Sequence, residues 1–167
     1  GQTIELGDFK IEFIRSNHSI ADTVALAIFT PVGVVIHSSD FKIDYTPIEG
    51  ETLDLARISE LGSKGVLLLL SDSTNVEREG YTMSERTVGD AFEEIFRKVR
   101  SRIIVATFAS NVHRIQQIIN ASVKFNRKIA IVGRSMVNVT NAAIETGYLK
   151  IPEGTLIDVD HIDRYAP

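Results

Sequence analysis

The stretch Val66-Leu67-Leu68-Leu69-Leu70-Ser71-Asp72-Ser73-Thr74-Asn75 is an apolar run that ends abruptly in a polar cluster. The run is strand-sized, and a strand without polar alternation is typical of a parallel sheet with both faces covered. In open α/β sheets, ligands bind beyond the carboxyl ends of the strands. The stretch therefore predicts a buried strand of an α/β fold, with Asp72 at the edge where a site would form.

Alternating patterns before this stretch predict antiparallel β-structure over residues 1–45. Apolar residues alternate there with small or polar ones, and the turn signals Gly7-Asp8 and Pro31-Val32-Gly33 favour hairpins. A further strand is expected at Gly33–His37. From about Thr52 the spacing becomes helical, and Gly62 is the expected end of that helix.

Helices and strands alternate after the polar stretch 76–84. A capping box at 82–85 precedes a helix, and further helices are expected over 110–124, with Val123 on the inward face, and over 135–146. Strands are expected over 102–108, 128–132 and 155–159. This alternation predicts a parallel sheet with right-handed crossovers. We expect two domains, residues 1–84 and 85–167, which meet at the end of the polar stretch.

Composition narrows the class of protein. The 167 residues include 22 acidic and 18 basic side chains, with 44% hydrophobic and 24% charged residues, which is ordinary for a globular protein. No apolar run approaches the roughly 18 residues of a membrane span, so no membrane partner is expected. There is no cysteine, which is compatible with a reducing cytosol, and any metal must be held by histidine and carboxylate.

Three residues at expected strand ends are candidates for metal chemistry. His18 and Asp40 offer imidazole and carboxylate, which are ligands for zinc or manganese. A turn histidine and an Asx turn are the simpler interpretation of these two residues alone. Asp72 needs a partner because an uncompensated buried carboxylate is costly. It could orient a catalytic or metal-bound histidine, or simply cap the turn that follows it.

Two expected helix N-termini are candidates for binding phosphate. Ser110, Asn111 and His113 open one helix directly after a strand, and Arg134 and Ser135 open the next. Free backbone N–H groups at a helix start favour anions, and a guanidinium can hold a phosphate in a bidentate manner. Capping by Ser110 and Ser135, with His113 on a solvated face, is the alternative interpretation.

Five segments, in order along nearly the whole chain, resemble the bacterial RNase J family, which are ribonucleases of the metallo-β-lactamase superfamily with a β-CASP insertion. The segments are Asn17–Asp22, His37–Asp44, Ser71–Asn75, Ala106–Arg114 and Val132–Met136. The resemblance implies part of a metallo-β-lactamase αββα sandwich over residues 1–84. It implies part of a Rossmann-like β-CASP domain with a parallel sheet over residues 85–167.

The resemblance also implies roles for the candidate residues. His18 and Asp40 would be metal ligands, and Asp40 would bridge two metal ions. Asp72 would orient a downstream histidine that acts on the leaving oxygen, so Asp40 and Asp72 are the expected catalytic residues. RNA phosphates would be bound by the residues at the two helix starts, namely Ser110, Asn111, His113, Arg134 and Ser135.

The departures from the family pattern set a further expectation. The family's His-x-His-x-Asp-His run and its later histidine motifs are absent, so the sequence is expected to be a fragment lacking both ends. Ser39 stands where the family usually has glycine, and Ala21 where it usually has proline. With two metal ligands, the chain by itself is expected to be inactive and to bind no zinc tightly, because a stable site needs three or four.

For the complete protein, the resemblance implies a zinc-dependent ribonuclease, with manganese as an alternative metal. It implies 5′-to-3′ exonuclease and endonuclease activity on single-stranded RNA, in cytoplasmic mRNA decay and rRNA maturation, and allows a homo-oligomer. Two other hypotheses stay open from the residues. One is a β-CASP nuclease that acts on DNA, and the other is a non-catalytic Rossmann-like module that binds a phosphate or nucleotide.

Overall fold

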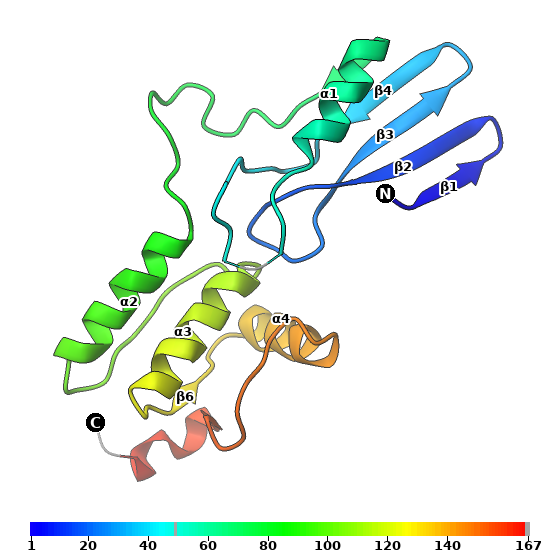
Figure 1. The fold of residues 1–167 in the computed structure, drawn as a ribbon. Coiled ribbons are helices and arrows are strands. Elements are labelled where there is room, and N and C mark those ends of the chain that lie inside the picture. Colours follow the sequence, from blue (N-terminus) through cyan, green and yellow to red (C-terminus); the bar gives the residue numbers. More distant parts are fainter. Residues whose placement is uncertain (49, 166–167) are drawn as a thin grey trace. The chain divides into compact units, whose positions relative to one another are not determined.

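The computed structural model describes residues 1–48 and 50–165, which form a mixed α/β chain (Figure 1). It divides into two compact units. Gly1–His18 and Asp22–Ser84 make the first unit, and Ser19–Ala21 belong with the residues from Glu85 onward. The two domains expected from the sequence, residues 1–84 and 85–167, stay a prediction. No helix among the described residues has the length and apolar character needed to cross a membrane.

The first unit contains a five-stranded sheet in the order β1-β2-β3-β4-β5. The hairpins predicted from the alternating pattern are confirmed, because the first four strands pair antiparallel in sequence order. The fifth strand pairs in parallel with β4. The elements are β1 (Thr3–Leu6), β2 (Phe9–Arg15), β3 (Val24–Thr30), β4 (Gly33–His37), α1 (Leu55–Lys64) and β5 (Leu68–Leu70).

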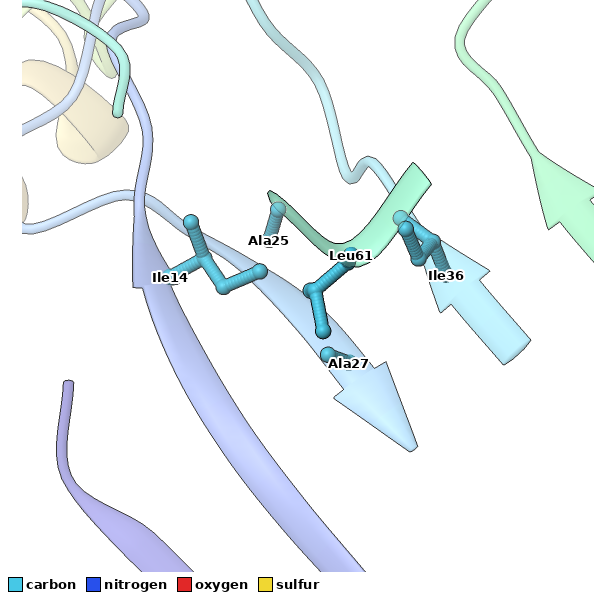
Figure 2. Close-up of a cluster of buried hydrophobic side chains, with 5 residues drawn as sticks. All are labelled: Ile14, Ala25, Ala27, Ile36 and Leu61. Atoms are coloured by element: carbon cyan, nitrogen blue, oxygen red, sulfur yellow. The ribbon is translucent and has the colours of Figure 1, made fainter. Parts of the chain in front are cut away.

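A small apolar core joins α1 to the sheet (Figure 2). Leu61 of α1 lies among side chains of β2, β3 and β4, and it is only 2% exposed. The sheet contributes Ile14, Ala25, Ala27 and Ile36. Beside this core, the Arg57 guanidinium donates to both Glu12 carboxylate oxygens, at 2.8 and 2.7 Å. Helix α1 is therefore attached to the sheet by packing and by a bidentate ion pair.

The end of α1 differs from the expectation. The helix begins at an Asp54 cap whose side chain accepts a hydrogen bond from the Arg57 N–H. It continues through Gly62 to Lys64, so Gly62 as its end was wrong. Gly65, with φ of +96°, ends the helix instead, since a positive φ is accessible to glycine at little steric cost.

Strand β5 was expected to be covered on both faces, and within the described residues this expectation is wrong. β5 is the last strand of the sheet, so only β4 pairs with it in the part of the chain that the structure describes. Its residues Leu68, Leu69 and Leu70 are between 46% and 60% exposed. Hydropathy alone predicts burial of such a run, but what lies over it is decided by tertiary packing.

In the part of the chain that the structure describes, the second unit has three α-helices, a short parallel strand pair and a 3₁₀ helix. The elements are α2 (Arg86–Lys98), α3 (Val112–Lys124), β6 (Ile129–Ala130), α4 (Arg134–Glu145), β7 (Leu156–Ile157) and the 3₁₀ helix Val159–Arg164. β6 and β7 pair in parallel, as expected for two of the predicted strands, although both are shorter than predicted. The 3₁₀ helix was not predicted.

Two clusters of buried side chains form the core of this unit. One joins α3 and α4 through Val112, Ile115, Ile119, Ala143 and Leu149. The other joins α2 and α3 through Phe92, Phe96 and Ala121. The apolar stripe predicted for α3 is thus confirmed at three positions, while Val123, expected inward, is 43% exposed.

Residues 102–108 do not form the predicted strand. Ile103 and Val105 pack against the Phe92 and Phe96 cluster, whereas Ile104 is 95% exposed. The alternation expected of an extended segment is therefore present. A strand also needs a hydrogen-bonded neighbour. Among the described residues of the second unit, β6 and β7 pair with each other, and residues 102–108 join no sheet.

The capping box expected at 82–85 is also wrong. Glu85 is the N-cap of α2, and it makes no side-chain capping bond. Its carboxylate instead accepts hydrogen bonds from Nε and Nη2 of Arg114, at 2.6 and 2.9 Å. This pairing links the start of α2 to α3, so a tertiary ion pair has displaced the local motif.

Candidate functional site

The two predicted metal ligands lie side by side in the first unit. His18 follows β2 and Asp40 follows β4, and the His18 Nε2 atom is 3.7 Å from the Asp40 Oδ2 atom. β2 and β4 each pair antiparallel with β3, so they run in the same direction and their carboxyl ends share one edge of the sheet. Two ligands of one tetrahedral zinc ion lie roughly 3.3 Å apart, from bond lengths of about 2.0–2.1 Å. The spacing therefore suits a shared ion.

Asp72 follows β5, which runs parallel to β4, so it lies at the same sheet edge. Its Oδ1 atom accepts hydrogen bonds from the Thr74 N–H, at 2.8 Å, and the Thr74 hydroxyl, at 2.7 Å. The turn capping considered from the sequence therefore forms. The Thr74 hydroxyl is the largest cause that lowers the pKa of Asp72, followed by the Thr74 backbone, the Phe41 N–H and the charge of His18. The charge of His18 is the smallest of these causes, so the pKa of Asp72 is set mainly by Thr74.

Hydrogen bonds donated by backbone N–H groups hold the three loops together. The Ser38 N–H donates to Leu70 O at 2.9 Å, and the Lys42 N–H donates to Asn17 O at 2.6 Å. The Asp72 N–H donates to the Ser38 hydroxyl oxygen at 2.8 Å. Ser38, Thr74 and the Phe41 amide were not predicted as site residues. Their only signal in the sequence is that they flank the predicted carboxylates.

Removing the Thr74 hydroxyl is expected to raise the pKa of Asp72. Thr74→Val keeps the side-chain shape and the backbone donor, so the pKa should rise toward its ordinary value without reaching it. Because folding lowers this pKa, the carboxylate stabilises the fold above its unfolded-state pKa. That contribution is lost as the pH falls through the folded-state pKa. In the valine variant, the folded-state pKa should lie closer to the unfolded-state pKa, so Asp72 should stabilise the fold less.

The measurement is an NMR titration of the Asp72 carboxyl carbon. Thr30→Val is the matched control, because the Thr30 hydroxyl donates to Gly33 O in the turn between β3 and β4. An Asp72 titration midpoint that is the same in both variants would contradict the assignment of the Thr74 hydroxyl as the main cause.

Ser39 has a backbone conformation that glycine adopts more easily. Its φ is +56°, in the left-handed region, and its position is the one where the resemblance leads us to expect glycine. The left-handed conformation costs an L-residue about 1–2 kcal/mol, partly offset by the greater freedom of glycine in the unfolded chain. The loop therefore carries strain next to Asp40.

Ser39→Gly is expected to stabilise the chain by about 0.5–1 kcal/mol. Ser63→Gly, inside α1, is the opposite control and should destabilise it by about 0.5 kcal/mol, because glycine is a poor helix former. Urea unfolding followed by circular dichroism measures both. A Ser39→Gly variant less stable than the wild type would mean that the serine side chain, rather than the backbone, decides this position.

His18 and Asp40 carry donor atoms that suit a metal ion, but they are too few to hold one. His18 and Asp40 offer the nitrogen and oxygen donors that zinc and manganese accept. Among residues 1–48 and 50–165, however, no three His, Asp or Glu side chains gather closely enough to hold an ion. His18 and Asp40 would therefore supply only part of a ligand set.

The predicted phosphate-binding residues at the start of α3 differ in their exposure to solvent. Asn111, not Ser110, is the N-cap, since its side-chain oxygen accepts from the Arg114 N–H at 3.1 Å. Asn111 is buried, whereas Ser110 is exposed and His113 is half-buried. The expectation that Ser110 caps the helix was wrong. Ser110 precedes the helix, and its carbonyl oxygen accepts a hydrogen bond from the Val112 N–H at 2.9 Å.

The candidates at α4 both lie in its exposed first turn. Arg134 and Ser135 are the first residues of the helix, and the N-cap is Gly133, with φ of +100° and no side-chain capping bond. Ser135 as the cap was therefore wrong. An exposed guanidinium next to uncapped backbone N–H groups is an arrangement that attracts anions.

Comparison with known proteins gives a family match within the second unit. Residues 100–167 match the family model for the β-CASP domain of ribonuclease J. The class is therefore that of proteins with a β-CASP domain. The sequence relatives then extend the match into the first unit.

Three curated ribonucleases J illustrate the match. The chain is 46% identical to that of Helicobacter pylori over 97% of its length, and 51% identical to that of Synechocystis over 93%. It is 42% identical to that of Mycobacterium tuberculosis over 100% of its length. The chain belongs to the ribonuclease J family. It spans 23%, 24% and 30% of the length of these three relatives.

A solved structure supports the fold independently. A protein of unknown function from Enterococcus faecalis matches 99% of this chain with a TM-score of 0.65, and this chain covers 41% of it. The sequence identity is 14%, so the likeness concerns the fold alone.

Proposed function

We propose that this chain supplies part of the active centre of a metal-dependent ribonuclease. In this proposal, residues 1–84 are part of a metallo-β-lactamase sandwich, and His18 and Asp40 are ligands of its metal centre. The observation that carries the proposal is the 3.7 Å separation of the His18 Nε2 and Asp40 Oδ2 atoms at one sheet edge. Asp40 would bridge two ions and so contribute to both.

The residues of the chain would have distinct tasks in hydrolysis. A bound zinc or manganese pair would supply Lewis acidity and an activated water. Asp72, kept ionised by the Thr74 hydroxyl, would accept an N–H from a downstream histidine and so set the orientation of its ring. That histidine would then act on the leaving oxygen of the phosphodiester.

The second unit would bind the RNA backbone. Ser110 and His113 at the start of α3, and Arg134 and Ser135 at the start of α4, would contact phosphates. The buried Asn111 would shape the α3 terminus, because its side-chain oxygen caps the helix. Phosphate contacts set the register of a nucleic acid but carry no sequence information. Choice of RNA over DNA would require contacts to the 2′-hydroxyl.

The proposed activity is 5′-to-3′ exonucleolytic and endonucleolytic cleavage of single-stranded RNA in mRNA decay and rRNA maturation in the cytoplasm. The test joins this chain to the family's remaining metal motifs in one longer polypeptide. That polypeptide is assayed on 5′-monophosphorylated RNA and on the matching DNA, with zinc or manganese. Metal-dependent RNA cleavage supports the proposal, cleavage of DNA in preference points to the DNA nuclease, and no cleavage refutes both.

The 167-residue chain alone is expected to bind zinc weakly. His18 and Asp40 fall short of the three or four protein ligands of a stable site. After dialysis against a chelator, metal analysis should therefore find well under one zinc ion per chain. A stoichiometric zinc ion that resists the chelator would contradict the partial ligand set.

A further inference from the structure

Asp44 is a buried carboxylate in the loop that carries Asp40. It follows β4 outside any helix or strand, and it is 6% exposed. A buried carboxylate is costly unless hydrogen bonds and cations compensate it. Its Oδ1 atom accepts from the Thr46 N–H at 3.0 Å, and the Lys42 ammonium is 3.8 Å from Oδ2.

The same carboxylate reaches Ser84, the last residue of the first unit. The Ser84 hydroxyl donates to Asp44 Oδ2 at 2.9 Å, and Thr46 O is a second acceptor at 3.0 Å. A hydroxyl carries one proton, and the charged acceptor makes the stronger bond. The Lys42 ammonium donates to Met83 O at 2.6 Å. Residues 83–84 are therefore tied to residues 42–46.

The Asp40 loop is thus attached on both sides of Asp40. On one side, Ser38 is bonded to the end of β5 and to the Asp72 N–H. On the other side, Asp44 is bonded to Ser84. The Asp40 side chain is itself 75% exposed, so packing does not hold it in place. Its position therefore depends on how its loop is attached, through Ser38, through Asp44 and through the Lys42 N–H, which donates to Asn17 O.

We propose that Asp44 is a positioning residue for the metal centre, and that its hydrogen bond with Ser84 holds Asp40 where it can share an ion with His18. This inference rests on the proposed metal-binding role of Asp40. Asp44 touches neither metal nor RNA in this proposal. It acts through the backbone of residues 41–43, which connects it to Asp40.

The first test uses the 167-residue chain and needs no metal. Ser84→Ala removes the donor to Asp44 Oδ2 and leaves the Thr46 N–H on Oδ1. Ser63→Ala is the matched control, because the Ser63 hydroxyl donates to Glu60 O within its own helix. Amide hydrogen exchange of residues 41–46 should be about tenfold faster in Ser84→Ala, as expected for loss of a hydrogen bond to a charged group. Equal exchange in the two variants would overturn the attachment.

The second test uses the longer polypeptide with the complete metal motifs. Equilibrium dialysis should show that Ser84→Ala and Asp44→Asn need about tenfold more zinc or manganese for half-saturation, with the KM for RNA unchanged. Ser84→Thr, which keeps the hydroxyl, should restore metal affinity. A merely structural role would lower the melting temperature and leave metal half-saturation unchanged, and that result would overturn the proposal.

The two proposals can fail separately. If Asp40→Ala leaves metal affinity unchanged, the proposed function fails, and the inference about Asp44 falls with it. If Asp40→Ala abolishes metal binding while Ser84→Ala behaves like Ser63→Ala, only the positioning role of Asp44 fails.

Discussion

Replacing Asp40 by alanine is expected to lower the rate of RNA cleavage by at least about a hundredfold in the polypeptide that carries the complete metal motifs. Loss of a residue that merely supports a metal ligand costs 10–100-fold, and a direct ligand should cost no less. The structure adds a reason, because the Asp40 carboxylate lies within 3.7 Å of the His18 imidazole. Alanine leaves His18 without this partner for a shared ion.

Initial rates on 5′-monophosphorylated RNA at saturating metal measure this effect. Asp8→Ala is the control, since Asp8 lies in the turn between β1 and β2 and is exposed. The control should cleave RNA at the wild-type rate. If the Asp40→Ala and Asp8→Ala enzymes cleaved RNA equally fast, the proposed metal centre would be wrong.

Leu61→Ala is expected to destabilise the chain by about 3–5 kcal/mol. Leucine-to-alanine changes in cores cost about 2–5 kcal/mol, depending on how far the site can collapse. Leu61 is 2% exposed, and its neighbours Ile14 and Ile36 project from strands of a paired sheet that cannot readily close on the cavity. We therefore place the cost in the upper part of the range.

Urea unfolding at constant pH, followed by circular dichroism, measures this cost. Leu55→Ala is the matched control in the same helix, where Leu55 is 37% exposed and the expected cost is about 1 kcal/mol or less. Equal costs for the two variants would show that Leu61 does not attach α1 to the sheet.

Local pattern was sufficient where neighbouring residues decide the conformation. The alternation in residues 9–15 and 24–30 predicted β2 and β3, because apolar residues at every second position fit a strand and do not fit a helix. The stripe through Val112, Ile115 and Ile119 predicted α3 in the same way. The ordered motif segments predicted the ribonuclease J family, which the comparisons bear out.

Pattern failed where a distant partner intervenes. Glu85 fits a capping box, yet its carboxylate binds Arg114 on another helix. Leu68–Leu70 is as apolar as a buried strand, yet within the described residues it lies at the edge of its sheet. Residues 102–108 alternate like a strand but have no assigned strand partner among the described residues.

The same distinction between local sequence and distant contacts applies to the candidate site. The sequence by itself determined which side chains could bind a metal or a phosphate, because that depends on the chemistry of His18, Asp40 and Arg134. Only the tertiary structure decided which of them meet. His18 and Asp40 come together because β2 and β4 run in the same direction beside β3, so their carboxyl ends share an edge. The common direction of β2 and β4 follows from hairpins that the sequence predicted. What local sequence does not encode is the pairing of the loops beyond them, such as the bond from the Lys42 N–H to Asn17 O.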